Sequence, residues 1–402
     1  LLLCLLLQGL HAQNYQTVNS GRIAYFSFND FSALKIDSTK VLNGDSVFYP
    51  SRSLGGADYR CLSPQAPSWS GSQIIVRPDG TNIYFNQNND SIAIRTQAGL
   101  NESWIAFQRA DSITIRAEVV ACLYDTILGM ADSVKTIQFQ VLDSVGQPVD
   151  DPVNQMQLQL SKHYGWKKAL CFNLFPNLVN DSYEPQQYFR TGLLVGLTNP
   201  RVGRQNLTWF DVYDFQPGDV LHVYEAHYGC CGVSPCKHYY NRFIYTYLNR
   251  NESPDSIVYR VDRVSQQMVI QYPDTVSTLF KRDTIWERIT PNRQFDVIPG
   301  ELVATEHKSH IRLTRQFNKV GLEYKDLVGY FAVADNASCW RMVHFDGGGS
   351  YDYIQGLGGG YYEYNEICEG RLRELQYYKK GNKEWGTPFH FTGVETAQAS
   401  AN

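Results

Sequence analysis

An alternation of apolar and polar side chains with a period of two residues constrains this chain more than any other feature. It runs through residues 113–119, 137–141, 156–160, 243–247 and 257–261. Because successive side chains of a strand point to opposite faces, it places one face on a core and the other in water, as in antiparallel sheets. The best candidates for short helices are residues 183–188 and 317–326. We predict a mainly β protein of antiparallel meander, sandwich or half-barrel sheets, with two domains and few short helices.

A second pattern marks where strands are expected to start. Asp and Ser brace turns through bonds to nearby backbone, and β-branched residues favour strands. Asp-Ser or Asp-Thr followed by Val or Ile recurs at Asp45, Asp90, Asp111, Asp132, Asp143, Asp255, Asp274 and Asp283. This recurrence predicts successive hairpins.

Composition and charge exclude two classes of protein. The 402 residues include 36 Lys and Arg against 40 Asp and Glu, so the formal net charge is −4. No net positive field attracts phosphate, and we expect no nucleic-acid partner. Aromatic residues make up 13% of the chain, too many for a disordered protein.

The N-terminal residues 1–12, LLLCLLLQGLHA, indicate export. We predict a signal peptide that lacks its basic start and is cleaved near Ala12, which makes the mature protein secreted or cell-surface. The run is shorter than the roughly 20 apolar residues of a membrane span, and we expect no membrane-spanning segment. The alternative is a buried N-terminal strand, although so many leucines without a β-branched residue are unusual in strands.

The stretch 176–200 is the best candidate for a domain connection, because it is rich in Asn and Pro. We therefore expect an N-terminal β domain at 13–175, a linker or long connection at 176–200 and a C-terminal β domain at 201–390. The small, polar residues at 391–402 are expected to form a disordered tail.

Three further stretches carry a family resemblance, namely DSVKTI at 132–137, LSKHYGW at 160–166, and YYKKG at 377–381 with WGTP at 385–388. With the leader ending in Ala-Gln, they resemble uncharacterised exported cargo proteins of the type IX secretion system. The resemblance implies secretion machinery as a partner during export and a C-terminal sorting domain that would begin after 392–397, and we expect this sequence to be a fragment without it. It implies a location and no known reaction.

The densest group of reactive side chains lies at 222–238 and comprises His222, His227, Cys230, Cys231, Cys236 and His238. Zinc needs four nitrogen or sulfur ligands, which Cys231, Cys236 and His238 could supply together with Cys230 or His227. The favoured alternative is a Cys231–Cys236 disulfide across a short turn, because thiols pair in an oxidising compartment. Unpaired cysteines are the third alternative.

Removal of the leader would leave eight cysteines, an even number that permits four disulfides. A second expected bridge joins Cys339 to Cys368 and closes a glycine- and tyrosine-rich loop, worth about 3–4 kcal/mol in the chain-entropy model. The glycines of that loop fit hairpin turns better than a phosphate cradle, because the fingerprint spacing is missing.

Other candidate sites have simpler explanations. On a strand, His307 and His310 would point to opposite faces, so two solvated histidines are expected. The oxygen-rich loops at Asp79-Gly80 and at 86–90 could bind calcium. Hairpin turns between strands at 74–76, 83–85 and 92–94 explain them better, with a type I′ turn at Asp79-Gly80.

Sequence signatures of catalysis are missing, including the Gly-x-Ser-x-Gly elbow, His-Glu-x-x-His and the Walker loop. Asp211 and Asp214 are a carboxylate pair of the type that glycosidases use. We predict a non-catalytic binding or structural module for an extracellular ligand, a glycan or a protein, without a cofactor. A secreted hydrolase of polysaccharide or peptide is one alternative. A protein that binds zinc through the 222–238 group, or calcium through its loops, is another.

Overall fold

Antiparallel strands make up most of the chain in a computed structural model, which confirms the predicted mainly β fold. Its described residues are 15–28, 31–58, 61–109, 113–176, 191–229, 237–271, 275–303, 310–336, 339–343, 350–365 and 369–391. In these segments the helices are α1 (Trp209–Val212) and two 3₁₀ turns, η1 (Pro152–Gln155) and η2 (Phe172–Leu174). None of them has the length and apolar character of a membrane-crossing helix.

The chain divides into two compact units. Unit 1 takes the described residues up to Gln205, together with the short segments Ile298–Glu301 and Asp335–Arg341. Unit 2 takes Asn206–Val297, Leu302–Ala334 and the described residues from Met342 onward. Strand β15 (Thr191–Thr198) belongs to unit 1. The change of unit therefore follows Gln205, beyond the stretch in which the sequence placed the connection.

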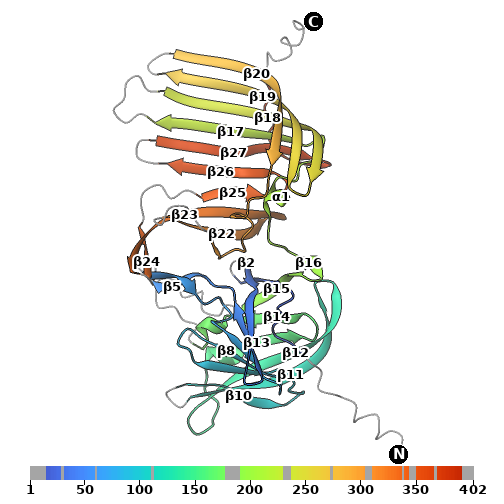
Figure 1. The fold of residues 1–402 in the computed structure, drawn as a ribbon, viewed down its shortest axis with the longest axis vertical. Helices are drawn as coiled ribbons and strands as arrows, with labels where there is room; N and C mark the ends of the chain where they lie inside the picture. Colours follow the sequence, from blue (N-terminus) through green and yellow to red (C-terminus); the bar gives the residue numbers. More distant parts are fainter. Residues whose placement is uncertain are drawn as a thin grey trace, which may run out of the picture. The chain divides into compact units, whose positions relative to one another are not determined.

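Unit 1 contains two main sheets (Figure 1). The larger has the order β10 (Ser103–Gln108), β11 (Thr114–Ile127), β12 (Met130–Leu142), β13 (Gln157–Ser161), β14 (Gly165–Leu170), β15, β1 (Ala24–Ser27) and β2 (Phe31–Leu34), with β16 (Arg201–Gly203) beside β15. The smaller has the order β3 (Ile36–Leu42), β4 (Asp45–Pro50), β7 (Ile74–Val76), β8 (Thr81–Phe85) and β9 (Ser91–Arg95). A hairpin of β5 (Ser53–Asp58) and β6 (Cys61–Ala66) pairs with β24 (Cys339–Val343) through Leu62 and Trp340.

The core of unit 1 lies where the two sheets face each other. Ile137, Phe139 and Leu158 of the larger sheet are almost completely buried in one cluster with Tyr84 of the smaller sheet. Trp166 Nε1 donates a hydrogen bond to the Tyr84 hydroxyl at 3.0 Å. The alternation in the sequence therefore identified the core-facing side of these strands correctly.

Unit 2 is built on a sheet of long strands that lie side by side (Figure 1). Their order is β20 (Thr275–Ile289), β19 (Ser256–Gln271), β18 (Lys237–Ser253), β17 (Val220–Gly229), β27 (Glu369–Lys380), β26 (Gly358–Asn365), β25 (Ser350–Ile354) and β23 (Leu322–Asn336). Strand β28 (Lys383–Gly386) pairs with β27, β22 (His310–Lys319) with β23, and β21 (Leu302–Val303) with β22.

The predicted helix at 317–326 is wrong. Strands β22 and β23 form a hairpin there, with Lys319 paired to Leu322. Val320 and Gly321 make the turn in the left-handed region, at φ 51° and 81°. The other predicted helix, at 183–188, lies outside the described residues.

The oxygen-rich loops of unit 1 are hairpin turns. Strands β7, β8 and β9 occupy the positions predicted for them. Gly80 N–H donates to the Arg77 carbonyl and Gly80 alone has positive φ, so the loop is a type I turn with a glycine bulge and not the predicted type I′ turn. In the next loop, the Asn86 side chain accepts from the N–H groups of Asn88 and Asp90.

The Asp-Ser and Asp-Thr pattern marks some strand starts and not others. Asp45 opens β4, and Asp90 and Asp255 directly precede β9 and β19. Asp132 and Asp283 instead lie inside β12 and β20. A local turn motif therefore does not always mark a turn, because a strand can continue through it.

Candidate functional site

A hollow of about 250 Å³ opens on one face of the unit 2 sheet. We call it the tyrosine hollow. Its aromatic lining comes from Tyr213, Phe215, Tyr245, Tyr247, Trp286 and Tyr361, and its charged lining from Arg263, Glu287 and Arg373.

Strand register places the sheet residues of the hollow on the same face. Directly opposed residues of an antiparallel pair project to the same side. Tyr245 of β18 is opposite Arg263 of β19, which is opposite Asp283 of β20. On the other side, Tyr245 is opposite Leu221 of β17. The hollow therefore has a floor of strands β17 to β20, which follow one another in the sequence, and β27 pairs with the other edge of β17.

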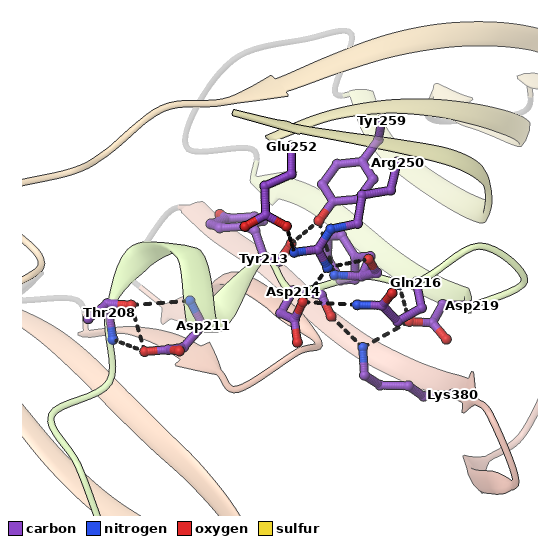
Figure 2. A network of polar contacts seen from close by, with 11 residues as sticks. Thr208, Asp211, Tyr213, Asp214, Gln216, Asp219, Arg250, Glu252, Tyr259 and Lys380 are labelled. Atoms are coloured by element: carbon purple, nitrogen blue, oxygen red, sulfur yellow. Dashed lines mark hydrogen bonds and ion pairs between the residues drawn. The ribbon is translucent and has the colours of Figure 1, made fainter. Parts of the chain in front are cut away.

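The loop that follows helix α1 forms one wall of the hollow. Phe215 stacks on Tyr247 with ring centroids 4.0 Å apart. The Tyr259 hydroxyl donates to the Tyr213 carbonyl at 2.6 Å and accepts from Phe215 N–H at 3.2 Å (Figure 2). These bonds fix the backbone between the two aromatic rings, so the wall is held before any ligand arrives.

The two carboxylates that the sequence suggested as a glycosidase pair, Asp211 and Asp214, support this wall (Figure 2). Asp211 completes a capping box with Thr208 at the start of α1. Asp214 pairs with Arg250 and accepts from Gln216 Nε2 at 3.0 Å. Both acids therefore have structural partners on the loop itself.

A lysine ties the same loop to the sheet. Lys380 Nζ donates to the Asp214 carbonyl at 2.5 Å and to the Asp219 carboxylate at 2.8 Å (Figure 2). Arg250 adds a bond to the Phe215 carbonyl at 3.0 Å. These bonds anchor the loop that forms the wall of the hollow to strands β18 and β27.

Burial shifts the pKa values of polar groups in the hollow. Burial raises the pKa of Glu287 above its ordinary value, although the charge of Arg373 opposes the shift. Burial also raises the pKa of Tyr245 to about 12, so its hydroxyl remains neutral at physiological pH. Arg373 forms an ion pair with Glu225, yet its buried Nε–H has no hydrogen-bond partner.

His222, from the predicted metal-binding group, is a buried structural residue. It is 5% exposed and lies between the rings of Tyr377 and Phe389. Its Nδ1 accepts a hydrogen bond from Phe389 N–H at 2.7 Å. Burial, followed by the nearby His390, lowers its pKa to about 4.

His227 and His238 lie on neighbouring strands and point to opposite faces. His227 of β17 is opposite Tyr239 of β18, and Nε2 of its ring bonds Glu369 Oε1 at 2.9 Å. His238, one residue before Tyr239, stacks on Tyr228 instead. The two imidazoles therefore do not converge on one ion. The remaining residues of that group, Cys230, Cys231 and Cys236, lie outside the described residues.

The cysteines and the other candidate metal ligands do not form a metal site within the described segments. Of the expected Cys339–Cys368 pair, Cys339 begins β24 and Cys368 lies outside the described residues. Cys122 is a free thiol on the surface, whereas Cys171 is buried. His307 also lies outside, and His310 begins β22. Within the described part of the chain, no three His, Cys, Asp or Glu side chains converge as metal ligands would.

Two of the stretches that carry the family resemblance meet in unit 1. Asp132 of β12 is buried and accepts from Ser161 Oγ and from His163 N–H at 2.9 Å. It also contacts His163 Nδ1 at 2.8 Å. The carboxylate thus braces the turn between β13 and β14, which is a structural role.

Sequence reasoning missed the charged residues of the hollow, Arg263, Glu287 and Arg373. A usable signal existed for Glu287, which stands between Ile285 and Ile289 where the alternation predicts an apolar residue. Comparisons with protein-family models, curated proteins and solved structures return no significant match.

Proposed function

We propose that this protein is a non-catalytic binding module that holds one sugar ring in the tyrosine hollow. The observation that carries the proposal is the lining of the hollow, in which aromatic rings surround the charged side chains of Arg263, Glu287 and Arg373. Binding pockets combine apolar and aromatic walls with a few fixed polar groups. A sugar offers both an apolar ring face and hydroxyl groups, which Glu287 and the guanidinium of Arg373 could bind.

The lining suits a neutral ring better than a charged ligand. Arg263 is neutralised by Asp283 through bonds of 3.0 and 2.7 Å, and Arg373 is paired with Glu225. Glu287 with its raised pKa is then the remaining acid of the lining. Tyrosine rings provide an apolar surface and a polar tip at little conformational cost. The volume lies below the roughly 300–1,000 Å³ of pockets for drug-sized ligands, which fits one ring.

We also propose that the protein works outside the cytoplasm, as a secreted or cell-surface protein. The apolar leader supports this location, and the resemblance to type IX secretion cargo is consistent with it. Extracellular glycans would be within reach of such a protein. Mass spectrometry of the secreted full-length product would test the location, because it reports cleavage near Ala12 directly.

Calorimetric titration with a panel of neutral, acidic and N-acetylated monosaccharides tests the binding proposal. Glu287→Gln should weaken the best ligand about 10- to 100-fold, because a hydrogen bond to a charged group is worth about 1.5–3 kcal/mol. The matched control is Glu363→Gln, an exposed acid outside the hollow. If Glu287→Gln binds the sugar as tightly as the control does, the hollow is not the site.

Hydrolysis of a glycan is the second candidate, supported by a specific observation. Asp352 and Glu374 both line a cleft beside the hollow. Burial raises the pKa of Asp352, as a general acid requires. Incubation with the bound glycan followed by an assay for new reducing ends separates the two functions. If the wild type produces new reducing ends and Asp352→Asn does not, the protein is a hydrolase and the binding proposal is wrong.

A further inference from the structure

We propose that the ligand is an extended oligosaccharide, one unit of which fills the tyrosine hollow while the next units cross Tyr361 into a second cleft. This inference rests on the proposed function. The second cleft has a volume of about 270 Å³ and is lined by Leu322, Tyr324, Leu357, Tyr378 and Trp385, among others. We call it the tryptophan cleft.

The two cavities lie next to each other on the same sheet face. Tyr361 lines both of them. Leu221 of the hollow is directly opposite Tyr378 of the cleft, and Val223 of the hollow is opposite Leu375 of the cleft. Since opposed residues of β17 and β27 share a face, a chain leaving the hollow enters the cleft without crossing the sheet.

The cleft offers a stacking platform of the kind that a sugar ring uses. Trp385 and Tyr378 have ring centroids 6.1 Å apart and planes inclined by 23°. Trp385 is 57% exposed, although large aromatic residues are usually mostly buried. An exposed ring on a supported platform is available for contact with a ligand.

Polar groups in the cleft favour a saccharide over an acyl chain or an apolar peptide. Lys319 and Asp352 line it together with the aromatic residues. Lys319 Nζ lies 5.3 Å from the centre of the Tyr324 ring. An apolar occupant would bury the ammonium and the carboxyl without hydrogen bonds, which is costly. Sugar hydroxyls would satisfy both groups and still stack on the aromatic rings.

The test is a length series of the saccharide that the hollow binds, from one unit to four, measured by calorimetric titration against the full chain. Affinity should rise at least tenfold over the first added units and then level off. Trp385→Ala should remove most of this gain and leave the affinity for the single unit unchanged, while Trp385→Phe should keep part of the gain. Tyr124→Ala, which removes an aromatic ring that is 87% exposed in unit 1, is the control and should behave as the wild type.

The outcomes separate the two proposals. If the single unit binds and longer chains bind no tighter, the extension is wrong and the hollow stands. If longer chains bind tighter and Trp385→Ala keeps the whole gain, the ligand runs elsewhere and the inference is overturned. If no saccharide of any length binds, the proposed function and the extension fail together.

Discussion

Acidification should destabilise unit 2 through one residue, His222. The buried ring accepts a hydrogen bond from Phe389 N–H, and a protonated imidazole has no lone pair with which to accept it. Beside the ring lie the aromatic side chains of Tyr377 and Phe389, and the nearby His390 lowers the pKa further. The folded state therefore favours the neutral imidazole.

The size of the effect follows from linkage. The pKa of His222 falls from its ordinary value of 6.5 to about 4 on folding. The unfolded chain then binds more protons between these two values, so stability falls as the pH falls from about 6.5 to about 4 and changes no further below that. The difference is worth about 3 kcal/mol in full and about 2.5 kcal/mol at pH of about 4.5.

Urea unfolding at pH of about 7 and about 4.5 measures this loss, with His222→Asn as the partner variant. The Asn carbonyl oxygen can accept from Phe389 N–H as Nδ1 does, and it does not titrate. His222→Asn should lose about 2.5 kcal/mol less than the wild type over this pH interval. The exposed His227→Gln should follow the wild type. Equal losses in the wild type and His222→Asn would refute the reasoning, as would an imidazole titration midpoint near 6.5 by NMR.

Three further changes test the packing of the described residues. Lys325→Met should cost about 3 kcal/mol of unfolding free energy in a denaturant titration, because the fully buried ammonium bonds three backbone carbonyls and one side-chain amide oxygen. Gly196→Ala should abolish soluble expression or cost more than about 3 kcal/mol, since its Cβ would lie 1.7 Å from a carbonyl oxygen, while Gly99→Ala stays within about 0.5 kcal/mol. Native labelling with a maleimide followed by mass analysis should show a fast-reacting Cys122, and Cys122→Ser should lose that one label.

The sequence predicted the sheets well because strand alternation is a local property. Residues two apart share a face whatever the rest of the chain does, so the apolar face of β12 could be read directly. The failure at 317–326 also has a local cause. Val320 occupies the left-handed region, which β-branched residues avoid, so no turn was expected there. The neighbouring Asn318 stabilises the turn by accepting a hydrogen bond from Gly321 N–H at 3.1 Å, and this contact could not be predicted from the sequence.

The tyrosine hollow could not be predicted as a whole, because β27 with Arg373 joins the consecutive strands β17 to β20 only through distant pairing. Strand β17 pairs with β27, so Val223 is opposite Leu375, and the intervening chain contributes Glu287 from a third strand. The spacing of residues along the sequence does not predict which distant strands pair. The sequence does show charged residues at positions where the strand pattern calls for apolar ones.

A charge on a core-facing position is not by itself a sign of function, as two residues demonstrate. Asp132 is such a residue, and its oxygens accept from the backbone and side chains of the β13–β14 turn. Folding alone therefore explains it. Arg373 differs, because 32% of its side chain remains exposed although it pairs with Glu225. It also lines the tyrosine hollow, so a ligand held there could contact the guanidinium. No ligand could reach Asp132 in this way, because only 3% of its side chain is exposed.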